Sequence, residues 1–191
     1  MSSNSDTVLL AFLRDYSRKL HVREIGRLVK MNRQTASQTL KSMEQKRILN
    51  SEISGKQKKY YLNRGLVAKL HVINAENLKR IEICEKKPVI ARLPQYIETK
   101  NIFLLFGSYA KDTERNNSDI DVAIIGEKKP DFSRFEKETG KTVQPFCMTK
   151  AQFIRGYLKK DHLILEIVKD HICLKNVEAF VDLMWAAYNG H

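Results

Sequence analysis

The stretch NIFLLFGSYAKDTERNNSDIDVAII, residues 101–125, decides the fold of the larger part of this chain. After Asn101, residues 102–106 form a continuous apolar run, which predicts a buried strand. Gly107-Ser108 follows directly, and a charged loop leads to a second apolar run, residues 118–125, that begins with Asp119 and Asp121. Because side chains two residues apart on a strand point to the same face, these carboxylates are expected to lie side by side. Such a pair suits Mg²⁺ (or Mn²⁺) shared with triphosphate oxygens.

The Gly107-Ser108 pair offers groups that can bind a phosphate. Gly107 lacks a side chain, so the backbone there can approach a phosphate closely. Ser108 adds a hydroxyl group, and backbone N–H groups at the start of a following helix also suit a phosphate. The pattern as a whole therefore predicts a site for a nucleoside triphosphate and its divalent cation.

The segment GSYAKDTERNNSDIDVAII resembles the nucleotidyltransferases of the polymerase-beta-like superfamily, particularly their small prokaryotic members, and the resemblance extends over about residues 88–190. It implies that Gly107 and Ser108 hold the β- and γ-phosphates of a nucleotide. It also implies that Asp119 and Asp121 are catalytic, binding Mg²⁺ for in-line attack on the α-phosphate. Lys111 and Ser118 are additional candidates for phosphate contacts.

One departure from the family pattern concerns catalysis. The family places a third carboxylate on a later strand, which here corresponds to residues 141–147, and the acidic position falls at Gln144. An amide can hydrogen-bond a hydroxyl group but cannot take its proton. Glu136 and Glu138 lie on the preceding predicted helix and are the nearest substitutes in sequence. Nucleotide binding is expected to survive this change, whereas efficient transfer is in doubt.

The basic charge of the chain is concentrated at its start. The net charge is +12, and residues 1–64 hold 14 Lys and Arg against 5 Asp and Glu, a balance of +9. A basic excess in one segment is typical of proteins that bind nucleic acid, although lysine-rich solvated surfaces are also ordinary.

Within residues 1–64, a helix over about 22–29, a turn at 30–32 and a helix from Asn32 to about Lys46 predict a helix-turn-helix. Ala36, Leu40 and Met43 mark its buried face. The opposite face has only polar side chains able to contact base edges or phosphates: Arg33, Gln34, Ser37, Gln38 and Lys41.

Two short runs around Ser54-Gly55-Lys56 predict a hairpin made basic by Lys56, Lys58 and Lys59. With the preceding helices, this segment resembles the winged helix-turn-helix domains of small prokaryotic transcription regulators. The resemblance implies that these lysines and the polar helix face bind double-stranded DNA. The alternative is a winged helix used for protein contact.

The predicted fold class is α+β, with a winged helix-turn-helix domain over 1–64, a helical linker over 65–87 and an α/β nucleotidyltransferase domain with a mixed sheet over 88–191. The linker has an imperfect apolar stripe with a break near residues 74–77. The stripe fits a homodimer contact and equally fits packing between the domains. In the tail, His162 and His171 are expected to be structural.

Composition narrows the function classes. The longest apolar runs span about five residues where a membrane helix needs roughly 20, the polar start has no secretory pattern, and three widely spaced cysteines suit a reducing cytoplasm. Two hypotheses remain. One is a DNA-binding regulator that binds Mg-nucleotide and transfers it weakly or not at all. The other is an active nucleotidyltransferase acting on a protein, small molecule or nucleic-acid end, for example an antitoxin-type protein that modifies a toxin partner.

Overall fold

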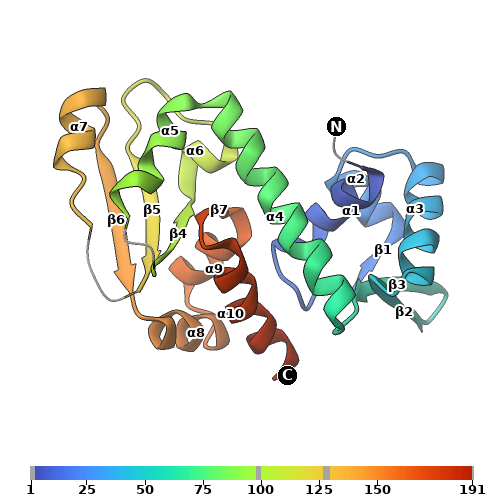
Figure 1. Cartoon of the computed structure of the whole chain (residues 1–191). Helices are drawn as coiled ribbons and strands as arrows, with labels where there is room; N and C mark the ends of the chain where they lie inside the picture. The colour runs from blue at the N-terminus through green and yellow to red at the C-terminus, as the bar shows by residue number, and fades with distance from the viewer. Residues whose placement is uncertain (1–2, 98–99, 127–129, 191) are drawn as a thin grey trace. The chain divides into compact units, whose positions relative to one another are not determined.

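The computed structural model describes residues 3–97, 100–126 and 130–190. The chain divides into two compact units, one formed by Met1–Ala75 with Tyr188–His191 and the other by Glu76–Ala187 (Figure 1). Among the described residues, no helix is long and apolar enough to cross a membrane. We describe each unit by itself.

The first unit contains helices and a small antiparallel sheet. Its elements are α1 (Asn4–Leu13), β1 (Leu20–His21), α2 (Val22–Leu28), α3 (Arg33–Gln45), β2 (Leu49–Ser54) and β3 (Gln57–Leu62). The three strands pair in the order β1-β3-β2. Gly55, with a φ of +62°, lies in the two-residue connection between β2 and β3. The predicted hairpin is therefore confirmed.

Local sequence accounts for the start of α3. The side chain of Asn32 accepts a hydrogen bond from the backbone N–H of Thr35 at 2.9 Å, as expected of an N-cap. Ala36, Leu40 and Met43 are buried, as predicted from their spacing. α1 begins at Asn4, where Ser3 caps the helix in a reciprocal pair with Asp6.

Helix α4 (Leu66–Lys86) is continuous, so the predicted break near residues 74–77 is wrong. Side-chain partners stabilise the helix at this point: Asn74 donates to Asp6 at 3.3 Å, and the buried Glu76 pairs with His171. Tertiary contacts thus outweigh the weak helix propensity of asparagine. The division between the two units lies within this helix.

The second unit is built on a mixed four-stranded sheet, which confirms that part of the predicted fold. The strands are β4 (Ile102–Leu105), β5 (Ile120–Ile125), β6 (Val143–Met148) and β7 (Ile172–Lys175), in the order β6-β5-β4-β7. Only β5 and β6 pair in parallel. The helices are α5 (Pro88–Arg92), the 3-10 helix η1 (Leu93–Tyr96), α6 (Gly107–Lys111), α7 (Ser133–Thr139), α8 (Lys150–Leu158), α9 (His162–Asp170) and α10 (Val177–Asn189).

One face of the sheet packs into the main core of this unit. Phe103 and Leu105 of β4 meet Ile120, Val122 and Ile124 of β5 there, all of them buried. The alternation of a strand then directs Asp121 to the other face of the sheet. The core thereby fixes which way this carboxylate points.

A buried polar pair ties α4 to the end of α9. The His171 ring lies 2.8 Å from Oε1 of Glu76 and 2.6 Å from the carbonyl of Val168, and both ionisable side chains are almost fully buried. Burial raises the pKa of Glu76, but the charges of His171 and Lys79 outweigh it and leave the pKa below its ordinary value. His171 is therefore structural, as predicted.

Candidate functional site

The turn after β4 brings Gly107 against the carboxylate of Asp121. The N–H of Phe106 donates to the carbonyl of Asp121 at 3.0 Å, and Gly107 takes a φ of +69°. A Cβ atom at position 107 would collide with Oδ2 of Asp121. Glycine is required here both for its conformation and for space. The half-buried Ser108 follows, and its carbonyl accepts from the N–H of Thr113 at 3.1 Å.

The two aspartates differ in their surroundings. Asp119 is exposed and directly precedes β5, whereas Asp121 is the second residue of the strand and is partly buried. Burial raises the pKa of Asp121, the charges of Asp119 and Glu166 raise it further, and Lys111 opposes them. The surroundings of Asp121 therefore disfavour its ionised form.

The parallel register of β5 and β6 places Gln144 directly opposite Asp121. Neighbouring residues in register on parallel strands point to the same side of a sheet. Gln144 is exposed and its amide has no charge. The strand position next to the aspartates thus offers a hydrogen-bonding group without a carboxylate.

Lys111, at the end of α6, contacts two acidic residues of α9. Its Nζ lies 3.3 Å from Oε1 of Glu166 and 3.4 Å from Oδ2 of Asp170. Neither acidic residue was predicted as part of the site, because only the packing of α6 against α9 brings them there. The one signal in the sequence is their i,i+4 spacing on the polar side of an amphipathic helix.

Ser118 closes the loop that leads into β5. Its hydroxyl oxygen accepts from the N–H of Arg115 at 2.9 Å, and its own N–H donates to the carbonyl of Arg115 at 3.0 Å. The structure thus shows a turn-forming role for the hydroxyl group that the sequence suggested for a phosphate.

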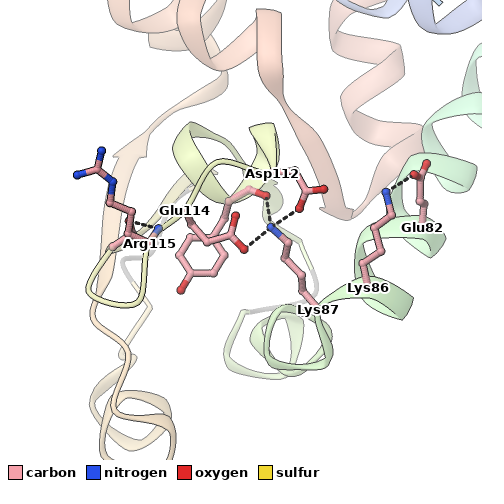
Figure 2. A network of polar contacts seen from close by, with 8 residues as sticks. Glu82, Lys86, Lys87, Asp112, Glu114 and Arg115 are labelled. Carbon is pink, nitrogen blue, oxygen red and sulfur yellow. Dashed lines mark hydrogen bonds and ion pairs between the residues drawn. The ribbon is translucent and has the colours of Figure 1, made fainter. Parts of the chain in front are cut away.

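Lys87 binds acidic residues at the start of the loop that leads from the Gly-Ser turn to the aspartates (Figure 2). Lys87, nearly buried, lies 2.8 Å from Asp112 and 2.5 Å from Glu114, and it donates to the carbonyl of Tyr109 at 3.3 Å. Burial lowers the pKa of Lys87, but hydrogen bonds and charges from the two acidic residues outweigh it and raise the pKa. Figure 2 shows Arg115 directed away from Lys87. This network holds the loop between the Gly-Ser turn and the aspartates.

The donor set fits a metal that arrives with its nucleotide. Across residues 3–97, 100–126 and 130–190, no group of three or more His, Cys, Asp and Glu side chains is placed to hold a metal ion. Mg²⁺ is commonly held by one or two carboxylates together with substrate phosphates and water. Asp119 and Asp121 would supply these two carboxylates.

The surface of the first unit presents the polar face of α3. All five side chains predicted there are exposed: Arg33, Gln34, Ser37, Gln38 and Lys41. On the hairpin, Lys56 is exposed, whereas Lys58 pairs with Glu44 of α3 at 2.7 Å and lies 5.1 Å from the centre of the Tyr60 ring. Lys59 is half-buried. The hairpin lysines are therefore not equivalent.

Comparison with known families agrees with the second unit. The model of the family "Polymerase beta, Nucleotidyltransferase" matches residues 72–178, more than half of the chain. The chain belongs to the polymerase beta nucleotidyltransferase family. Searches of curated proteins and of solved structures found no match.

Proposed function

We propose that this protein is a DNA-binding regulator whose nucleotidyltransferase unit binds a nucleoside triphosphate with Mg²⁺. The observation that carries the proposal is the contact between the Gly107 backbone and the Asp121 carboxylate, with Asp119 two residues before it. This contact sets a backbone that can approach phosphates beside two carboxylates that can share a cation.

Each residue of the proposed nucleotide site has a role. Gly107 and Ser108 hold the β- and γ-phosphates, and Asp119 and Asp121 bind Mg²⁺. Lys111 has the charge to add a phosphate contact, and Ser118 keeps the aspartates in place by closing their loop. The cation, when bound, neutralises charge on the triphosphate.

A thermal-shift titration tests this site. Wild-type protein is heated with Mg²⁺ and each of ATP, CTP, GTP and UTP, beside the Asp119→Asn/Asp121→Asn variant and a control, Glu82→Gln. Glu82 pairs with Lys86 at 2.7 Å on an exposed face of α4. A nucleotide at 100 times its Kd stabilises by about 2.7 kcal/mol, or roughly 5–10 °C. We expect that shift in wild type and Glu82→Gln only. No shift with any of the four nucleotides contradicts the proposal.

We propose a winged helix-turn-helix for the first unit. Three observations support it: the order of three helices and a three-stranded antiparallel sheet, the exposed polar face of α3, and the net charge of +9 over residues 1–64. Arg33 suits guanine, Gln34 and Gln38 suit adenine, and Ser37 and Lys41 suit phosphates. The basic hairpin adds Lys56 and Lys59, with Lys58 contributing less because Glu44 already neutralises it.

DNA binding is tested with a pool of random duplexes, from which bound sequences are selected and then measured by fluorescence anisotropy. We expect Lys56→Ala to weaken binding to all DNA sequences. It should also reduce the slope of log affinity against log salt concentration by about one, because one phosphate contact is lost. Lys58→Ala should have a smaller effect than Lys56→Ala. Lys137→Ala, an exposed lysine of the second unit, is the control. Failure to enrich any duplex over the random pool contradicts DNA recognition.

Nucleotide binding can regulate DNA binding only if the nucleotide has different affinities for the DNA-competent and DNA-incompetent states. The two ligands then affect each other's affinity by the same factor. Anisotropy titrations with and without the nucleotide measure that factor directly. A factor of one leaves two independent binding activities in one chain.

We also propose that the protein acts as a homodimer in the cytoplasm. Leu66 and Leu70 of α4 are largely exposed, at 69% and 55%, although both are apolar and one helical turn apart. Helix-turn-helix proteins commonly bind two half-sites as pairs. Sedimentation of wild type and Leu66→Ser/Leu70→Ser tests this, and a monomeric wild type at micromolar concentration contradicts it.

The second candidate is an active nucleotidyltransferase with a protein, small-molecule or nucleic-acid acceptor, including a toxin partner. It is favoured by the coexistence of the Gly-Ser turn and both aspartates in one site. Label from an α-³²P nucleotide appearing on an acceptor separates it from a pure sensor.

A further inference from the structure

The nucleotidyltransferase unit has a further acidic residue, Glu166, beside α6, on a different element from the one that carries Gln144. Helix α6 contacts both Asp121 and Glu166. Its first residue, Gly107, abuts the Asp121 carboxylate, and its last residue, Lys111, contacts Glu166 at 3.3 Å. Positions i and i+4 lie on the same side of a helix, about 6 Å apart along its axis. Asp121 and Glu166 therefore contact residues on the same side of α6, one at each end of the helix.

The two substitutes that the sequence suggested are engaged elsewhere. Glu138, one of them, pairs with Arg134 and Arg92. Glu136 accepts a hydrogen bond from the N–H of Val143 at 2.8 Å and fixes the start of β6. Both of those carboxylates therefore have structural tasks.

Glu166 is also accessible. Its side chain is 41% exposed and that of Lys111 is 37% exposed, whereas Asp170 is only 12% exposed. An exposed ion pair of this kind is weak. Triphosphate oxygens offer Lys111 stronger charge-assisted contacts, and its transfer to them leaves the Glu166 carboxylate without its lysine.

We propose that Glu166 of α9 is a catalytic residue that accepts the proton of the attacking hydroxyl group, in place of the carboxylate absent at Gln144. Lys111 is its partner in the nucleotide-free protein. The inference rests on the proposed nucleotide site and extends it to transfer chemistry.

The O–H bond of the acceptor breaks as its proton passes to a carboxylate oxygen of Glu166. The freed electron pair forms a bond between the acceptor oxygen and the α-phosphorus. The bond from the α-phosphorus to the oxygen that bridges to the β-phosphate breaks, and its electron pair leaves on pyrophosphate. With water as the acceptor, the products are a nucleoside monophosphate and pyrophosphate.

The test uses the full-length chain, the α-³²P-labelled nucleotide that gives the largest thermal shift, Mg²⁺, and water as the acceptor. Formation of the labelled nucleoside monophosphate, which accompanies pyrophosphate release one to one, is measured for wild type, Glu166→Gln, Glu166→Asp, Gln144→Asp/Glu166→Gln and the control Glu82→Gln. Nucleotide affinity is measured for each by thermal shift. We expect Glu166→Gln to lose about 10²-fold or more in kcat, with its nucleotide affinity within a few-fold of wild type.

Rescue distinguishes proton transfer from a structural role. Glu166→Asp should regain part of the rate, and Gln144→Asp/Glu166→Gln should regain it by restoring a carboxylate on β6. The inference is overturned by unchanged release in Glu166→Gln, by a parallel loss of nucleotide affinity, or by failure of both rescues. It is overturned as well if wild type releases no more pyrophosphate than Asp119→Asn/Asp121→Asn. In each case, the thermal shift reports separately whether the nucleotide site itself stands.

Discussion

The two units place their charged groups in opposite ways. In the first unit, the side chains proposed to contact DNA from α3 are exposed, as is Lys56 on the hairpin, and each occupies its own position on the surface. In the second, Asp121 is partly buried, and Lys87 and Lys111 are each shared between two acidic residues. Exposed groups act nearly independently, whereas groups that share partners depend on one another. Substitutions should therefore have local, additive effects in the first unit and larger, coupled effects in the second.

The strongest test of this contrast is the buried pair of the second unit. Glu76→Ala leaves His171 buried without its carboxylate, which typically costs about 3–5 kcal/mol. Urea unfolding followed by the fluorescence of Trp185, the single tryptophan of the chain, reports this unit. An unchanged midpoint contradicts the prediction.

The same pair gives a dependence on pH. The pKa of Glu76 is lower in the folded chain than its ordinary value of 4.5, so folding favours the ionised form. Its contribution is present above the unfolded-state pKa and is lost as the pH falls through the lower folded pKa. Glu76→Gln should therefore lose less stability than wild type on acidification below about pH 4.5.

The next largest effect is expected at the Gly-Ser turn. Gly107→Ala places a methyl group against Asp121 at a positive φ, which should cost about 2–4 kcal/mol and abolish the nucleotide-induced thermal shift. Gly140→Ala is the matched control, because Gly140 has a φ of +66° and open space around it. A comparable loss in both variants attributes the effect to backbone strain alone.

An intermediate effect is expected in the first unit. Arg33→Ala should weaken binding to the selected duplex by about 1–3 kcal/mol, roughly 5–150-fold, and relax its preference at one base pair. The stability of the protein should not change, since Arg33 is exposed. Anisotropy with the selected duplex and its single-base variants measures both quantities. Equal losses on every duplex contradict base recognition.

The smallest effect has the opposite sign. Asp121→Asn should raise the Tm without nucleotide at pH 7, by about 1–3 °C, because burial and the charges of Asp119 and Glu166 disfavour the ionised form. The pKa of Asp121 is raised, so its penalty disappears as the pH falls below the unfolded-state value of 3.8. The two Tm values should then converge. A lower Tm for the variant at pH 7 contradicts this view of the site.

Local patterns predicted much of this fold. Four features follow from short-range chemistry: the cap at Asn32, the buried face of α3, the hairpin and the strands around the Gly-Ser turn. The two-residue strand β1 was not predicted, because it exists only through pairing of Leu20 with Tyr60. The continuity of α4 depends on the distant Asp6 and His171.

The candidate site also combines residues that local sequence predicts with residues that only tertiary packing brings near. Gly107, Asp119 and Asp121 are recognisable because one short segment contains them all. Glu166 and Asp170 come near only through the packing of α6 on α9, and the pairing of Lys58 with Glu44 depends on the hairpin meeting α3. Sequence spacing cannot indicate contacts of this kind.

The first unit is discontinuous along the chain, and this has a consequence for biosynthesis. Its last component is the end of α10, where the Tyr188 hydroxyl donates to the carbonyl of Leu62 at 2.7 Å and the ring lies 5.1 Å from the Arg64 guanidinium. Proteins are made from the N-terminus at about 5–20 residues per second. The unit that leaves the ribosome first is therefore completed last, several seconds or more after its α3 has been synthesised.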